Sequence, residues 1–153
     1  MKWDWKKLLI CLAIPVAVGG LAALLTGGGM GDYENFNQPP LSPPGWLFPV
    51  VWSILYLLMG YASYRVLASQ NAVKKPLRYY GAQLAVNFVW PLIFFGLQWY
   101  WAALFVLIGL WVLIFITWRE FAKVDEIAGN LLIPYLLWVT FAAYLNFGVA
   151  LLN

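Results

Sequence analysis

Long apolar runs alternate with short polar segments along the whole chain. Five runs are long enough to cross a bilayer, because a spanning helix needs about 20 apolar residues. They cover residues 8–26, 46–68, 79–98, 101–121 and 131–152. Glycine, proline and charged residues concentrate in the segments between them. The pattern predicts an all-α integral membrane protein, a bundle of five transmembrane helices that forms a single domain over residues 1–153.

The first apolar run follows basic residues, as the core of a signal peptide does. It extends to Thr26, which makes it longer than a signal core, and no small-residue cleavage site stands out. We therefore interpret it as a retained helix. The short connection between the third and fourth runs predicts that these two spans are antiparallel neighbours.

The composition supports a lipid environment. Of the 153 residues, 64% are hydrophobic and only 10% are charged, whereas soluble domains carry about a quarter charged residues. The mean hydropathy is +0.79. A chain of this composition cannot cover itself with polar groups, so lipid must be its solvent.

The basic residues predict the orientation in the membrane. All nine fall on one side of a five-span topology: Lys2, Lys6, Lys7, Arg65, Lys74, Lys75, Arg78, Arg119 and Lys123. The other side carries only Asp32 and Glu34. By the positive-inside rule, the amino terminus is cytoplasmic and the carboxyl terminus is outside. The net charge of +3 is thus a topology signal, and nucleic-acid binding is not indicated.

The chain lacks the residues that several classes of function need. The chain has no histidine and a single cysteine, Cys11, so an intramembrane metal or haem-iron site has almost no ligands. No charged residue lies deep in a span, and ion-coupled transporters and proton pumps need such residues. We expect no metal and no cofactor. Any ligand should be flat, large and mostly apolar.

Polar and aromatic residues recur at helical spacing on three of the spans. The third span carries Gln83, Asn87, Trp90 and Phe94; the fifth carries Tyr135, Trp138, Ala142 and Asn146; the second carries Ser53, Tyr56, Gly60 and Ser63, with Trp52 beside them. Pro91 lacks the N–H that would bond the carbonyl of Asn87, which frees an acceptor there.

Two interpretations of these stripes remain open. The polar groups can bond across helices and hold the bundle together. Alternatively they line a pocket of aromatic faces with a few amides and hydroxyls, the usual make-up of a small-molecule site. Their concentration on the second, third and fifth spans favours a pocket where these three spans meet.

Three segments resemble the TSPO/MBR family, the translocator proteins once called peripheral benzodiazepine receptors. They are SPPGWLFPVVWSILYLLMGYASY (42–64), GAQLAVNFVWPLIFFG (81–96) and LLIPYLLWVTFAAYLNF (131–147). The resemblance covers nearly the whole chain, with the same five-span order. It implies binding of porphyrins, cholesterol and synthetic ligands of the benzodiazepine type. For a bacterial-type member it also implies the cytoplasmic membrane.

The resemblance also implies which residues form the site. The family's cavity lies between the helices and is capped by the first connecting loop, here 27–45. Carried over by position, the ligand-binding residues are Trp52, Asn87, Trp90, Phe94, Trp138, Phe141, Ala142 and Leu145. Tyr56 joins them from the stripe on the second span. In bacterial relatives, tryptophans that match Trp52 and Trp138 are implicated in light-dependent porphyrin breakdown.

The chain departs from the family pattern in its first loop, at Pro49-Val50, where the proline stands one residue earlier than in the family, and near its carboxyl end. The first loop reads Gln38-Pro39-Pro40-Leu41 where many members have Lys-Pro-x-Trp. No basic residue follows Tyr144, although the animal sterol motif needs one there. The spacing Leu58-x-x-Tyr61-x-x-x-Arg65 fits that motif elsewhere, so a sterol-like lipid remains a candidate partner.

Three functions follow as hypotheses. The first is a non-enzymatic binding protein or carrier for porphyrins and similar flat hydrophobic ligands. The second is an enzyme that degrades porphyrin in light, with Trp52 and Trp138 as its catalytic residues. The third is a structural or sensory membrane subunit that acts through partners. A homodimer is also plausible, because Gly81 and Ala85 form a small-residue face on the third span.

Overall fold

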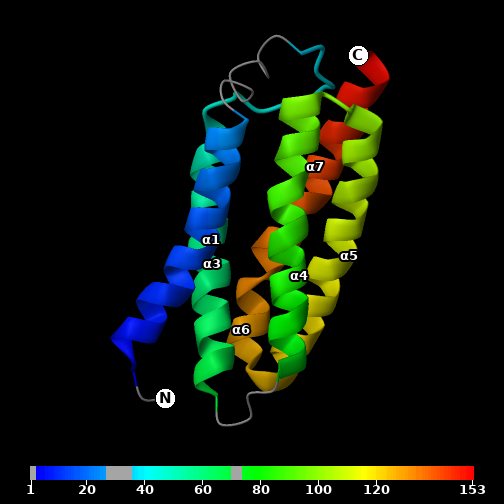
Figure 1. Cartoon of the computed structure of the whole chain (residues 1–153). Coiled ribbons are helices and arrows are strands. Elements are labelled where there is room, and N and C mark those ends of the chain that lie inside the picture. Colours follow the sequence, from blue (N-terminus) through cyan, green and yellow to red (C-terminus); the bar gives the residue numbers. More distant parts are fainter. Residues whose placement is uncertain (1–2, 27–35, 70–73) are drawn as a thin grey trace.

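A computed structural model of the chain describes residues 3–26, 36–69 and 74–153. Five of its helical segments are long and apolar enough to cross a membrane, as the apolar runs predict (Figure 1). The elements are α1 (Trp5–Leu25), α3 (Leu47–Ala68), α4 (Lys74–Pro91), η2 (Leu92–Leu97), α5 (Tyr100–Val124), α6 (Glu126–Leu131) and α7 (Ile133–Leu152). The third span combines α4 with η2, and the fifth combines α6 with α7.

Aspartate side chains begin two of the helices. Asp4 precedes α1 and accepts a hydrogen bond from the backbone N–H of Lys7 (3.1 Å). Asp125 precedes α6 and accepts from the backbone N–H of Ala128 (3.0 Å). Such caps satisfy N–H groups that the first turn of a helix leaves unpaired. Because of its cap, α1 starts at Trp5, before the first apolar run.

The third span changes its winding at Pro91. α4 ends at this residue, and the next six residues form a π-helix, η2. Pro91 cannot donate a backbone hydrogen bond, so the regular α-helical pattern is interrupted there. In the wider turn, the neighbouring residues Phe94 and Phe95 are both buried, and their ring centroids are 4.8 Å apart. Gln98, which follows η2, has a left-handed backbone.

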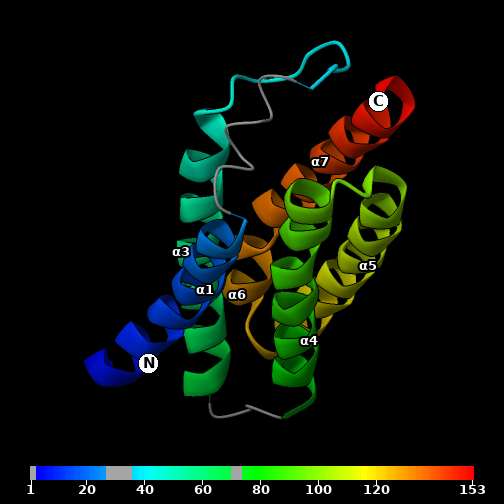
Figure 2. The ribbon, with the colours of Figure 1, turned by 45° about the horizontal axis from the view of Figure 1, so that its top comes forward.

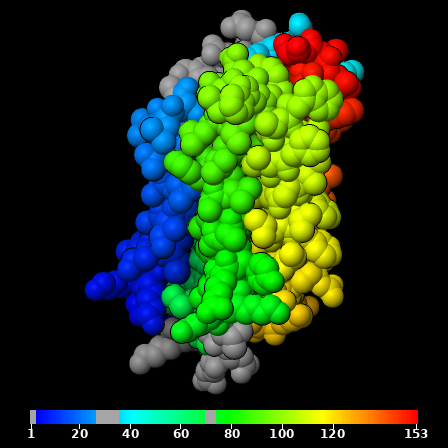
Figure 3. All heavy atoms as spheres, turned by 45° about the vertical axis from the view of Figure 1, so that its right-hand side comes forward, coloured from blue at the N-terminus to red at the C-terminus, as the bar shows by residue number. Residues whose placement is uncertain are grey.

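Consecutive spans run in opposite directions, but they do not all pack on one another, because α4 contacts α1 more than it contacts α3. α1 packs along α3, and α5 packs along both α4 and α7. Figure 3 shows α1, α4 and α5 side by side on one face of the molecule. At Gly60 of α3, a Cβ atom would lie 2.6 Å from the carbonyl oxygen of Cys11 in α1. Glycine at this position lets the two backbones meet.

The two termini lie at opposite ends of the bundle (Figure 1). Ion pairs gather at the end where α3 finishes and α4 begins. Arg65 lies 3.1 Å from Asp125, and Glu120 lies 3.7 Å from Lys75 and 3.2 Å from Lys123.

Of the charges that predict the orientation, Lys2, Asp32 and Glu34 lie outside the described residues. The predicted cap over the pocket is described only for residues 36–45, because 27–35 also lie outside them.

Candidate functional site

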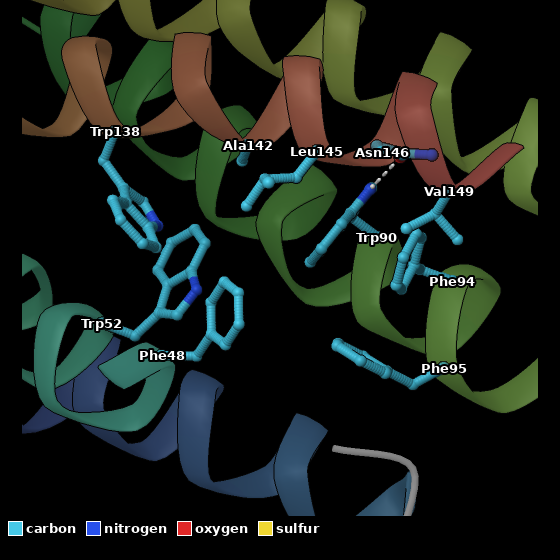
Figure 4. A pocket seen from close by; sticks show the side chains of 10 residues that line it. All are labelled: Phe48, Trp52, Trp90, Phe94, Phe95, Trp138, Ala142, Leu145, Asn146 and Val149. Atoms are coloured by element: carbon cyan, nitrogen blue, oxygen red, sulfur yellow. Dashed lines mark hydrogen bonds between the residues drawn. The ribbon is translucent and has the colours of Figure 1, made fainter. Parts of the chain in front are cut away.

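An inner cavity lies between α3, α4, η2 and α7. Its walls are aromatic or aliphatic except at one amide, and they are formed by Phe48, Trp52, Trp90, Phe94, Phe95, Trp138, Ala142, Leu145, Asn146 and Val149 (Figure 4). The volume is about 30 Å³. This is room for about one water molecule, so the inner cavity holds no larger ligand in this conformation.

A larger cavity lies beside it, between α1, α3 and α4. Its volume is about 440 Å³, which falls in the range of small-molecule sites. α1 contributes small residues, including Gly19, Gly20 and Ala23, and their size leaves the space open. Tyr56 and Asn87 supply polar groups to the wall.

Three aromatic residues form the partition between the cavities. Trp52, Trp90 and Phe95 line both of them. Figure 4 shows Trp52 and Trp138 on one side of the inner cavity and Trp90 on the other. These three side chains therefore separate the two spaces.

A chain of hydrogen bonds connects the larger cavity to the centre of the bundle. The Tyr56 hydroxyl donates to Oδ1 of Asn87 (3.2 Å), and Nδ2 of Asn87 donates to the Tyr135 hydroxyl (2.6 Å). That hydroxyl donates in turn to Oε1 of Gln83 (2.7 Å). Gln83 and Tyr135 are buried and line neither cavity, so they act as interhelical contacts. Asn87 has both roles, because it also lines the larger cavity.

Two of the three indole N–H groups of the inner cavity, those of Trp90 and Trp138, differ in their partners. Nε1 of Trp90 donates to Oδ1 of Asn146 (3.0 Å; Figure 4), and Nδ2 of Asn146 donates to the carbonyl of Tyr100 (2.9 Å). Nε1 of Trp138 is buried and has no partner within the described part of the chain. A buried donor without a partner costs about 1–3 kcal/mol. Trp138 therefore offers a hydrogen bond to an acceptor that enters this cavity.

The structure brings eight of the nine predicted site residues onto these walls. Trp52, Trp90, Phe94, Trp138, Ala142 and Leu145 line the inner cavity, and Tyr56 and Asn87 line the larger one. Phe141 lines neither cavity. Its ring lies against those of Trp138 and Tyr144, with centroids 5.7 and 6.2 Å away.

Sequence reasoning missed the contribution of α1. Val16, Gly19, Gly20, Ala22, Ala23 and Thr26 line the larger cavity, although this span offers little polarity. The signal available in the sequence is the cluster of small residues, which marks a place where helices leave room. Phe48, Phe95 and Val149 were missed because they carry no polar group to distinguish them from other apolar residues.

The described walls of the two cavities carry no charge. Among the residues that the structure describes, neither wall includes a charged side chain. The same residues contain no group of three or more His, Cys, Asp or Glu side chains able to hold a metal. The walls can bind a ligand by ring stacking, by apolar contact and through a few neutral hydrogen bonds.

Five membrane-spanning segments around a neutral aromatic cavity define an integral membrane protein of the helical-bundle class. The chain belongs to the TspO/MBR family, whose family model matches residues 11–152. It is 39% identical to the "Tryptophan-rich protein TspO" of Chlorobaculum tepidum over 95% of both chains. It is also 39% identical to the "Tryptophan-rich sensory protein" of Cereibacter sphaeroides, over 100% of this chain and 95% of the relative.

The relatives extend to animals. The chain is 36% identical to the "Translocator protein" of Ovis aries, over 80% of this chain and 75% of the relative. The family predicted from the three sequence segments is thereby confirmed. Members of this family bind hydrophobic ligands in general.

Proposed function

We propose that the protein binds and carries porphyrins and similar flat, hydrophobic molecules in the membrane. The observation that carries the proposal is the uncharged cavity of about 440 Å³, which has Trp52 and Trp90 in its wall. An indole face attracts a flat aromatic ring by offset stacking. A neutral wall favours ligands whose surface is mostly apolar, because a buried charge without a partner is costly.

The polar groups of the site can orient a bound ligand through hydrogen bonds. Asn87 borders the larger cavity, and Nε1 of Trp138 is an unpaired donor deeper inside. A ligand that enters the larger cavity meets the Trp52, Trp90 and Phe95 partition first. If the partition moves, the ligand reaches Trp138, whose N–H can donate to a ring nitrogen or carbonyl.

Quenching of tryptophan fluorescence by protoporphyrin IX tests this proposal. The Trp52→Ala, Trp138→Ala double variant should bind roughly five- to 150-fold more weakly, because each of the two aromatic contacts contributes about 0.5–1.5 kcal/mol. The control is Trp101→Ala, since Trp101 is exposed and lines neither cavity. Equal affinities in the double variant and the control would reject this site.

A second candidate function is porphyrin degradation in light. It is favoured by one observation, that Trp52 and Trp138 line the same inner cavity. Both indoles could exchange electrons with an excited ligand once the Trp52, Trp90 and Phe95 partition moves to admit it. Illumination of the complex in air tests it by product analysis. Product formation that persists in the Trp52→Ala and Trp138→Ala variants would count against a catalytic role for these residues.

A third candidate is a sensory or structural subunit. It is favoured by the name of the Cereibacter sphaeroides relative, a sensory protein. Its signature would be a stable complex with another membrane protein together with no affinity for protoporphyrin IX. Size analysis of the protein purified in mild detergent distinguishes this outcome and also tests a homodimer.

A further inference from the structure

The positive charges of the chain lie far from the larger cavity. On each helix that lines it, eight or nine residues separate the nearest lining residue from the nearest cation. The pairs are Val16 and Lys7 on α1, Leu57 and Arg65 on α3, Asn87 and Arg78 on α4, and Leu110 and Arg119 on α5. At a rise of about 1.5 Å per residue, the separation is about 12–14 Å along the helix axis. Long basic side chains also extend toward water, so they do not reach a ligand in this cavity.

The end of the bundle that holds the cavities has no positive charge in its sequence. Figure 2 shows this end, where α1 finishes, α3 begins and α4 finishes. The connection from α1 to α3, residues 27–45, contains no Lys, Arg or His, and its only charged side chains are Asp32 and Glu34. Residues 91–118 and 127–153 contain no charged side chain at all. The inner cavity, whose lining residues lie within 48–52, 90–95 and 138–149, is therefore also without a nearby cation.

An ionised carboxylate has no favourable place in either orientation of a bound ring. Protoporphyrin IX carries two carboxylates on one edge of its macrocycle. If that edge points into the bundle, it meets aromatic and aliphatic side chains, and a buried charge without a partner is costly. If it points toward the connection, that segment supplies only acidic charges, which repel it. A ring without ionised groups avoids both costs.

The free donor of the inner cavity suits a neutral acceptor. Nε1 of Trp138 is buried and has no partner within the described part of the chain. Asn146, on the same wall, already accepts from Trp90 and donates to the carbonyl of Tyr100. One neutral N–H can satisfy a carbonyl oxygen, such as that of an ester. An ionised carboxylate has two oxygens with about four acceptor sites and is best paired with a cation.

We propose that the aromatic cavities select rings without ionised groups, so that a porphyrin ester binds more tightly than the same porphyrin with free carboxylates. This selection rests on the proposed function, because it concerns the ligand of the same site. It follows from the distance between the cavities and the cations of the chain. Placing one cation at the cavity wall should therefore weaken it.

Thr26 is the position at which a cation can be added with least disturbance. It lines the larger cavity and is the C-cap of α1, with a helical backbone. Its hydroxyl donates to the carbonyl of Ala23 in the same helix (3.0 Å), so replacing it breaks only a local bond among the described residues. A lysine is favoured at the carboxyl end of a helix by the helix dipole.

Binding of protoporphyrin IX and of its dimethyl ester, measured in phosphatidylcholine nanodiscs, tests the selection. Nanodiscs without protein give the partition of each porphyrin into lipid, which is subtracted. The ester should bind to the parent chain at least about tenfold more tightly than the dicarboxylate, because the carboxylates find no cation. A dicarboxylate that binds as tightly as the ester, or more tightly, would overturn the proposal.

Thr26→Lys tests the cause of the selection, and Thr26→Gln is its matched control, a long polar side chain without charge. In Thr26→Lys the preference for the ester should fall roughly tenfold, because the ammonium can form a charge-assisted hydrogen bond with a carboxylate. Thr26→Gln should keep the preference of the parent chain. Equal preferences in the two variants would also overturn the proposal. Absence of binding of both porphyrins to the parent chain would instead reject the proposed function.

Discussion

Asn87 shows how one side chain can serve both the fold and the site. Its amide joins Tyr56 on α3 to Tyr135 on α7, and it also borders the larger cavity. The sequence left two interpretations of such residues open, interhelical bonding or ligand binding. At this position the geometry supports the first and is compatible with the second.

Replacing Asn87 with leucine should therefore destabilise the bundle. The variant loses two interhelical hydrogen bonds, each of which contributes about 0.6 kcal/mol and up to about 1.7 kcal/mol within a membrane. The free energy of unfolding, measured by denaturant titration in mixed micelles, should fall by about 1–3 kcal/mol. Ser53→Ala is the control, because among the described residues the Ser53 hydroxyl donates only to the carbonyl of Pro49 in its own helix. Equal stability of the two variants would contradict the bridging role of Asn87.

Asp125 should make stability depend on pH. It lies in the connection between α5 and α6. Burial raises the pKa of its carboxyl, but hydrogen bonds from the Ala128 N–H and from Arg65 lower the pKa by more than burial raises it. The net pKa therefore lies below the ordinary value. A lowered pKa stabilises the folded state above the ordinary pKa of about 4, and this contribution is lost as the pH falls through the lower pKa of the folded protein. Asp125→Asn should be less stable at neutral pH.

Thermal unfolding of both proteins at several pH values checks this prediction. The melting temperature of the parent chain should fall in acid toward that of Asp125→Asn. A constant difference between the two proteins at every pH would contradict the role of the Asp125 charge.

Individual site residues could be predicted where they carry a chemical signal at helical spacing. Trp52, Trp90 and Asn87 do so, and they reach the cavity walls. Phe141 was expected in the site by family position, but its ring lies beside Trp138 and outside both cavities. Helical spacing defines a face of one helix, whereas a cavity wall depends on how neighbouring helices are rotated.

At the scale of the helices, close packing of α1 on α3 depends on Gly60. An alanine Cβ at this position would meet backbone atoms of α1, with the Cys11 carbonyl oxygen at 2.6 Å. Backbone cannot move aside as a side chain can, so the helices must separate. Gly60→Ala should cost about 1–3 kcal/mol of unfolding free energy, measured by the same denaturant titration.

Gly81→Ala provides the matched control for this substitution. A Cβ at Gly81 meets no atom within 4 Å, and alanine is favoured over glycine in a helix by about 0.5–1 kcal/mol. The control should be neutral or slightly stabilised. A Gly60→Ala protein as stable as Gly81→Ala would show that the two helices do not depend on this contact.

The π-helix η2 is an element that sequence periodicity could not predict. Pro91 indicates an interruption, but it does not specify the winding that follows. Phe94 and Phe95 lie in the wider turn of η2, and both line the inner cavity. Breaks of this kind depend on tertiary packing as well as on proline.

For the whole molecule, the number of spans follows directly from the sequence because lipid imposes a strict condition. Every backbone polar group in the hydrocarbon must be paired, so a long apolar run must form a helix. The cavity volumes could not be predicted, because they are the small spaces left when all the helices have packed.

The orientation of the whole molecule in the membrane remains a proposal. The described basic residues lie toward one end of the bundle, and we propose that this end is cytoplasmic. Alkaline phosphatase is active only outside the cytoplasm, so a fusion after Asn153 should be active in bacterial cells. An inactive phosphatase fusion, together with a fluorescent fusion to a green-fluorescent-type protein at the same site, would show that the carboxyl terminus is cytoplasmic and contradict the proposed orientation.

Filling the larger cavity tests the central claim most directly. Gly20 lines this cavity and has no atom within 4 Å of an added Cβ, so Gly20→Phe adds a large side chain at the cavity wall and its Cβ meets no other atom. Gly81→Phe is the control, because Gly81 also has open space around it but lines neither cavity. Equilibrium titration with protoporphyrin IX should give at least about tenfold weaker binding for Gly20→Phe, a loss of about 1.4 kcal/mol. Equal affinity of the two variants would contradict binding between α1, α3 and α4.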